Sequence, residues 1–455
     1  MNGPLRLRAL TVMSAVMALA LCCAPDPASA QSRPEFINFQ GRTKAALYKP
    51  DAGPAPHVGI LVMHRTSNYL AHRACTELSR RGFLMLCMNT RYENNEAAVD
   101  FEKLPLDVKA GVEFLRRQNG ISKVVLFAHS GGGPLMALYQ AVAEKGPSYC
   151  KGSEKLTECG DDLAGLPRAD GIVFTDAHPG NSINTLRGLN PAVANENNPP
   201  DAPLIAALNP FDPNNGFNPN GPSNYSPEFQ ARYFKAQAER MNRLIDMARD
   251  KLARMKRNDY PYPDDDIMVI PRGGNPGSGP GASAALFIAQ PDIAAVNSTA
   301  QPRRLLRNDG TIETQMIKSV YVADPKLARD NLRFGTGTKV YTLRSFLSAN
   351  AIRAKSSIES SMDDIDYCST NNSTVCAIQS ISVPVLFAAM GAHYFIRDNE
   401  RHYDIAASKD KDFITIEGAV HGFGPCTACE RTPGQYSNSV KNLFDYVAKW
   451  LNDRF

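Results

Sequence analysis

Continuous apolar runs alternate with segments of helical periodicity along the first 180 residues of the chain. The runs VGILVMH (58–64), FLMLCMN (83–89) and KVVLFAH (123–129) are typical of strands that are buried on both faces. Between these runs, apolar residues recur at helical spacing, and glycines such as Gly82 and Gly120 mark helix ends. The repeated alternation predicts an α/β fold: a mostly parallel, doubly wound sheet with helices on both faces.

This alternation stops after GIVFTDAH (171–178) and returns about 200 residues later, at VPVLFAAMG (383–391) and DFITIEGAV (412–420). We therefore interpret residues 31–179 and 381–455 as the core and residues 180–380 as a cap or lid insertion. A long helix is expected at about 226–257. The aromatic residues of the insertion either line a substrate pocket or form its own core; they include Phe211, Phe217, Tyr225 and Tyr233.

The first thirty residues have the pattern of a secretory signal peptide. Arg6 and Arg8 precede an apolar run from Ala9 to Ala24, and Ala28-Ser29-Ala30 provides a small-residue cleavage site. The run is shorter than the roughly 20 residues that span a bilayer. We expect a secreted or periplasmic protein without a stable membrane anchor.

The net charge gives no sign of a nucleic-acid partner. The formal charge is +4 for the whole chain and +3 without the signal peptide, from 48 basic and 45 acidic residues. The basic residues are scattered instead of clustered, so we expect no nucleic-acid binding.

Six of the eight cysteines that follow the signal peptide form close pairs. In an exported chain, Cys150 with Cys159, Cys368 with Cys376, and Cys426 with Cys429 are expected to form local disulfides. Zinc is the alternative for the CTAC segment (426–429), but a matching second CxxC pair is missing. Cys75 and Cys87 are expected either as thiols or as a fourth pair.

A candidate nucleophile, Ser130, is expected where a predicted strand turns into a helix. Ser130 stands in AHSGG (128–132), with small neighbours that allow a tight strand-to-helix turn; the alternative is a structural glycine corner. A serine hydroxyl needs a base, and His421 follows the last predicted strand in EGAVHGFG (417–424). Both residues are expected at the carboxyl edge of the sheet.

These motifs, together with LVMHR (61–65), resemble the α/β-hydrolase superfamily. The resemblance implies that Ser130 is the nucleophile and His421 the base, and that the amides of Gly131 and Arg65 form the oxyanion hole. The usual first glycine of the motif is replaced by Ala128. The expected activity is hydrolysis of a small or polymeric carboxylic ester through an acyl-enzyme, without metal or organic cofactor. The alternatives are an inactive binding protein and a hydrolase of amide, lactone or carbon–carbon bonds.

The triad acid is the least defined part of the expected site. Members of the superfamily commonly carry Asp where this chain has His393. We favour Glu400, in the first turn of the next expected helix, because its longer side chain could reach back to His421. Asp398 and Asp176 are the alternatives.

Overall fold

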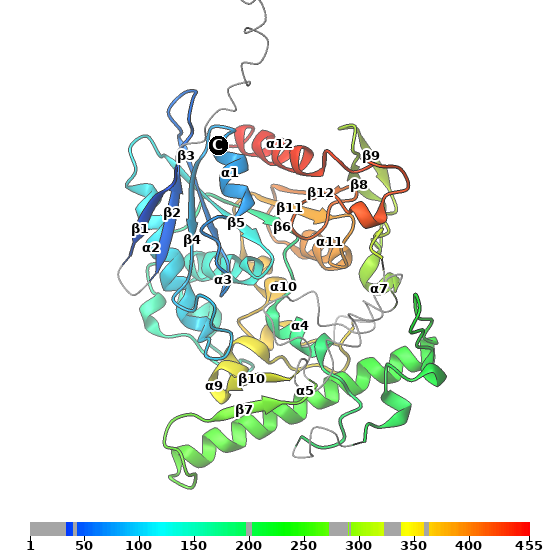
Figure 1. The fold of residues 1–455 in the computed structure, drawn as a ribbon. Helices are drawn as coiled ribbons and strands as arrows, with labels where there is room; N and C mark the ends of the chain where they lie inside the picture. Colours follow the sequence, from blue (N-terminus) through cyan, green and yellow to red (C-terminus); the bar gives the residue numbers. More distant parts are fainter. Residues whose placement is uncertain are drawn as a thin grey trace, which may run out of the picture.

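The central element of the computed structural model is a ten-stranded, mixed sheet in which most neighbouring strands are parallel (Figure 1). The structure describes residues 33–39, 43–196, 203–272, 290, 293–322, 338–358 and 364–455. The expected α/β fold class is confirmed. In sheet order the strands are β1 (Glu35–Asn38), β2 (Lys44–Tyr48), β4 (Leu84–Met88), β3 (Val58–Met63), β5 (Lys123–His129), β6 (Gly171–Thr175), β11 (Val385–Met390), β12 (Lys411–Ile416), β8 (Arg303–Leu306) and β9 (Ile312–Gln315).

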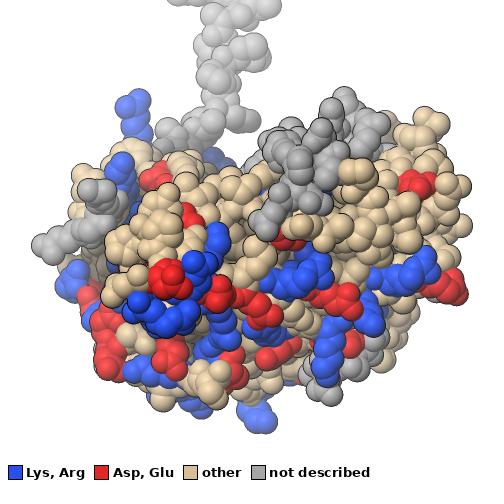
Figure 2. All heavy atoms as spheres, turned by 90° about the horizontal axis from the view of Figure 1, so that it is seen from below, with Lys and Arg blue, Asp and Glu red and all other residues tan. Residues whose placement is uncertain are grey.

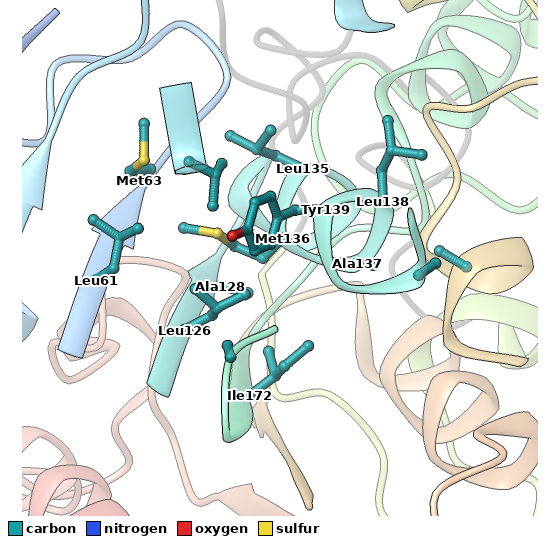
Figure 3. Packing of buried hydrophobic residues seen from close by; sticks show 14 of the residues in the cluster. Leu61, Met63, Leu126, Ala128, Leu135, Met136, Ala137, Leu138, Tyr139 and Ile172 are labelled. Atoms are coloured by element: carbon teal, nitrogen blue, oxygen red, sulfur yellow. The ribbon is translucent and has the colours of Figure 1, made fainter. Parts of the chain in front are cut away.

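Helices cover both faces of this sheet. One face packs against α1 (Arg73–Ser79) and the C-terminal α12 (Ser439–Asn452), and the other packs against α2 (Leu104–Arg116) and α3 (Gly132–Lys145). Figure 3 shows the second face, where side chains of α3 lie over those of β3, β5 and β6. The close approach of α2 depends on Gly111, because a Cβ there would lie 2.8 Å from Leu61. The two faces are apolar because the parallel strands are buried on both sides.

The inserted segment forms helices and a small sheet below the carboxyl edge of the central sheet in Figure 1. It contains α4 (Asn181–Gly188), α5 (Pro227–Lys256), α7 (Ala294–Asn297), α9 (Leu343–Ser345) and α10 (Thr374–Ala377), and the antiparallel pair β7 (Ile267–Ile270) and β10 (Lys339–Thr342). The long helix agrees with the expected range, and Ser226 begins it by accepting a hydrogen bond from the Phe229 amide.

The predicted aromatic residues of the insertion pack mainly on one another. Phe217, Tyr225 and Tyr233 are buried in one apolar cluster, against which Phe211 packs. The edge-to-face contact of Phe211 with Phe217 belongs to the same cluster. Of the two roles expected for these residues, the structure therefore supports a core of the insertion.

The insertion differs from the expectation in one respect: it returns two strands to the central sheet. β8 pairs in parallel with β12, and β9 pairs antiparallel with β8. Each strand has only four residues, RRLL and IETQ, and lies at the edge of the sheet. Their charged residues gave no continuous apolar run, which is why the pattern along the chain did not reveal them.

Four cysteine pairs lie within disulfide geometry. The Cα–Cα distances are 5.6 Å for Cys150–Cys159, 5.2 Å for Cys368–Cys376 and 5.2 Å for Cys426–Cys429. Cys75 on α1 and Cys87 on β4 form the fourth pair, at 6.3 Å. All four distances fall in the range that a disulfide spans.

We predict that non-reducing peptide mapping of the protein from an oxidising compartment recovers these four pairs. The Cys75–Cys87 bond should be the slowest to reduce, because both residues are fully buried. Free thiols at the three local pairs would contradict the assignment.

No helix among the described residues has both the length and the apolarity to cross a membrane. The expected signal peptide, residues 1–30, lies outside the described residues. Figure 2 shows that Lys and Arg side chains intermix with Asp and Glu on the face seen from below. That face carries no extended basic patch of the kind that binds nucleic acid.

Candidate active site

Ser130 lies on a tight turn between β5 and α3. Its φ is 55°, in the left-handed region that a residue with a side chain rarely occupies. Gly132 makes the turn possible, because a Cβ there would lie 2.4 Å from the Met63 carbonyl oxygen. The strained turn at the end of a central strand is the arrangement that presents a nucleophilic serine.

His421 lies in the loop after β12 and points its ring at Ser130. Its Nε2 is 2.9 Å from Ser130 Oγ. The loop is closed by a hydrogen bond from the Val420 amide to the Gly424 carbonyl and by the Cys426–Cys429 pair. The expected partnership of Ser130 and His421 is therefore present in the structure as a hydrogen-bonded pair.

The carboxylate that faces His421 belongs to Asp176, at the end of β6. Asp176 Oδ2 lies 2.5 Å from His421 Nδ1, and Asp176 is fully buried. Burial raises the pKa of this carboxyl, but the contacts with His393 and His421 outweigh burial and hold the pKa well below its usual range. Asp176 is therefore a carboxylate that can orient the imidazole.

The structure does not bring Glu400, the favoured acid, into contact with His421. Glu400 lies on α11 (Ile396–Ile405), 1% exposed, and its carboxylate accepts hydrogen bonds from the Ala300 and Gln301 amides and from Arg303 Nε, at 2.5, 3.1 and 2.9 Å. Asp398 is also engaged, by Arg187 at 2.8 and 3.1 Å. Both carboxylates form ion pairs with the inserted segment, and of the three candidate acids Asp176, one of the two alternatives, is the one that contacts His421.

His393, which stands where members of the superfamily commonly carry an aspartate, contacts both His421 and Asp176. Its ring stacks on the His421 ring at 4.6 Å between centroids. His393 Nδ1 also lies 2.8 Å from Asp176 Oδ2. Asp176, His393 and His421 are the group among the described residues whose ligand atoms could converge on a metal ion. Because both nitrogens of His421 are already engaged by Ser130 and Asp176, a metal there would have to displace these contacts.

Further imidazoles and one phenol, which the sequence did not single out, surround Ser130. His129 Nε2 is 2.9 Å from the His421 carbonyl oxygen, and His129 Nδ1 is 3.0 Å from both the Tyr69 hydroxyl and His72 Nε2. The Tyr69 hydroxyl also lies 3.5 Å from the His129 carbonyl oxygen, directly before Ser130 in the chain. Burial lowers the pKa values of His72 and His129 and raises that of Tyr69, so all three groups stay neutral. The position of His129 beside the nucleophile was the one available signal for this network.

Of the two amides expected to form the oxyanion hole, that of Gly131 directly follows Ser130, and that of Arg65 follows His64, whose ring lies against Gly131. Gly131 begins the turn into α3, and no described residue accepts a hydrogen bond from its amide or from that of Arg65. A Cβ at Gly131 would lie 2.5 Å from His64 Nε2 and 3.1 Å from His178 Nε2. His64 Nδ1 accepts from the Thr66 and Ser67 amides, which fixes the loop that carries Arg65.

The similarity to solved structures extends over most of the chain at low identity. The chain resembles Est1E from Butyrivibrio proteoclasticus (10% identity, 93% of this chain and 99% of the other, TM-score 0.38). It also resembles the α/β hydrolase GrgF from Penicillium sp. sh18 (10%, 92% and 98%, 0.41) and a monoglyceride lipase variant from Saccharomyces cerevisiae (12%, 93% and 97%, 0.39). No protein-family model and no curated protein sequence matches. Similarity at this level does not define a substrate, so the chemistry is derived from this chain's own residues.

Proposed function

We propose that this chain is an exported serine hydrolase that cleaves carboxylic esters through an acyl-enzyme. The observation that carries the proposal is the chain of contacts from Ser130 Oγ to His421 Nε2 (2.9 Å) and from His421 Nδ1 to Asp176 Oδ2 (2.5 Å). The three residues follow β5, β12 and β6, so the order of the strands in the central sheet brings them together.

In the first half of the reaction, His421 Nε2 takes the proton of Ser130 as Oγ attacks the ester carbonyl carbon. The imidazolium then gives that proton to the leaving alcohol, and the acyl group stays on Ser130. In the second half, His421 deprotonates a water molecule that attacks the acyl-enzyme, and the proton returns to Ser130 as the carboxylic acid leaves. Asp176 holds the ring in the required tautomer and stabilises the imidazolium.

The oxyanion of each tetrahedral intermediate is assigned to the amides of Gly131 and Arg65. Backbone donors in such a position typically contribute about 3–4 kcal/mol each to transition-state stabilisation. The amide of Gly131 also stands at the first turn of the 14-residue α3, where the helix dipole favours negative charge.

Export is supported by the signal-peptide pattern of residues 1–30 and by the four cysteine pairs, which are typical of proteins outside the cytosol. We further propose that residues 180–380 set substrate choice. This role is supported by α4, which begins five residues after Asp176, and by the hydrogen bond from the Thr342 amide of β10 to the Ala97 carbonyl.

We predict that a fluorophosphonate labels the mature protein once, on Ser130, and that Ser130→Ala abolishes labelling and turnover of short 4-nitrophenyl esters. Ser122→Ala, an exposed serine next to the start of β5, is the matched control and should be labelled like the wild type. Peptide mass spectrometry locates the adduct. A folded protein that resists the phosphonate would favour the binding-protein alternative. Labelling without ester turnover would favour hydrolysis of an amide, lactone or carbon–carbon bond.

A further inference from the structure

The guanidinium of Arg65 is buried beside the proposed site with most of its hydrogen-bonding capacity unused. Arg65 is 2% exposed, and its Nη2 donates to Glu96. Nε and Nη1, which together carry three N–H donors, have no partner among the described residues. A buried donor without an acceptor costs about 1–3 kcal/mol, and more when the group is charged.

This guanidinium lies close to the nucleophile. Arg65 directly follows His64, whose ring lies against Gly131, the residue after Ser130. The charge of Arg65 lowers the pKa values of His64 and His178, for which burial is the main cause. Both of these imidazoles border Gly131, so Arg65 lies within electrostatic reach of the point where a bound ester carbonyl would sit.

The surroundings of Arg65 carry a net positive charge. Within the part of the chain that the structure describes, Glu96 is the one acidic partner of Arg65, and its carboxylate also accepts a hydrogen bond from Thr66 Oγ1. Lys339, on β10, adds a second cation. Burial and the charge of Arg65 lower the pKa of its ammonium group, Glu96 raises it, and the net result is a pKa of about 8. With two cations against one carboxylate, the group has spare positive charge at neutral pH.

Space for a ligand adjoins this group. A cavity of about 520 Å³ opens between the loop after β3 and β10, lined by Thr66, Ser67, Glu96, Thr338 and Val340 among others. Arg65 and Lys339 are not among its lining residues. They adjoin the cavity through Glu96, the ion-pair partner of Arg65, and through Thr338 and Val340, the neighbours of Lys339 in the chain.

We propose that Arg65 and Lys339 bind an anionic group of the substrate, so that the preferred substrate is an ester that carries a carboxylate. The proposal rests on the proposed serine hydrolase function and specifies its substrate class. A carboxylate supplies acceptors for charge-assisted hydrogen bonds, which are about twice as strong as neutral ones. It would accept hydrogen bonds from the Arg65 donors that have no partner among the described residues, and it would balance the second cation.

The test uses matched substrate pairs with the full-length mature protein. One arm compares 4-nitrophenyl hemisuccinate with 4-nitrophenyl butyrate, which places the carboxylate in the acyl part. The other arm compares 4-carboxyphenyl butyrate with phenyl butyrate, which places it in the alcohol part. We expect kcat/KM to favour the anionic member at least 30-fold in one arm.

Arg65→Met and Lys339→Met should each reduce that preference at least fivefold, whereas Arg80→Met, which removes an exposed cation of the core, should preserve it. Thermal unfolding checks that each variant folds, and Lys339→Met decides the question if Arg65→Met does not. A wild-type enzyme that hydrolyses the neutral member of both pairs at least as well overturns this inference and leaves the serine hydrolase standing. Failure to hydrolyse any of the four esters, together with no labelling of Ser130, overturns both proposals.

Discussion

Replacing Asp176 with asparagine is expected to lower kcat for ester hydrolysis by about 10⁴-fold while the protein stays folded. The amide has almost the same shape as the carboxylate, but it cannot stabilise the His421 imidazolium, and its NH₂ group favours the wrong tautomer of the ring. Steady-state kinetics with a short 4-nitrophenyl ester, together with the thermal unfolding midpoint, measure both parts of this expectation.

Glu400→Gln is the matched control, because it makes the same chemical change at the acid that the sequence favoured. The variant should keep kcat within about threefold of the wild type. It should instead lose roughly 2–4 kcal/mol of unfolding free energy, since it weakens a buried ion pair with Arg303 and contacts to two amides. The reverse result, with kcat lost in Glu400→Gln and retained in Asp176→Asn, would overturn the assignment of the acid.

The pattern of apolar runs was sufficient to predict the central sheet, because strands buried on both faces leave a signal that does not depend on distant residues. The runs at 58–64, 83–89 and 123–129 became β3, β4 and β5. The signal fails at the edge of the sheet: β8 and β9 are short and carry charged residues such as Arg303, and their place beside β12 follows from long-range pairing.

Ser130 and His421 could be found from the sequence because each stands directly after a predicted central strand. The acid could not be chosen in the same way. Asp398 and Glu400 lie in the segment where an acid was sought, but their partners Arg187 and Arg303 are 211 and 97 residues away in the chain. Asp176 also ends a central strand, and its burial against His421 emerges only when β6 lies between β5 and β11.

The buried histidines are expected to make the unfolding free energy depend on pH. The chain has eight histidines. In six of them, His64, His72, His129, His178, His393 and His402, burial lowers the pKa below the ordinary value of 6.5. For His402, which is fully buried with no partner for either ring nitrogen among the described residues, the pKa falls to about 4.

We therefore predict that the unfolding free energy is largest above pH 7 and falls steeply from pH 6.5 towards pH 4. Below pH 6.5 the unfolded chain binds protons on imidazoles that the folded chain keeps neutral, so lowering the pH favours unfolding. Each such histidine contributes roughly 1.4 kcal/mol per pH unit, and two already remove about 3 kcal/mol between pH 6 and pH 5. Urea unfolding at pH 8, 7, 6 and 5 measures how the unfolding free energy depends on pH. His402→Met should reduce that dependence by the contribution of one histidine, roughly 1.4 kcal/mol per pH unit. The variant removes one buried imidazole from α11 and leaves Ser130, His421 and Asp176 unchanged. A free energy that stays constant from pH 7 to pH 5 would mean that the folded protein accepts these protons, and that its histidine cluster is hydrated instead of dry.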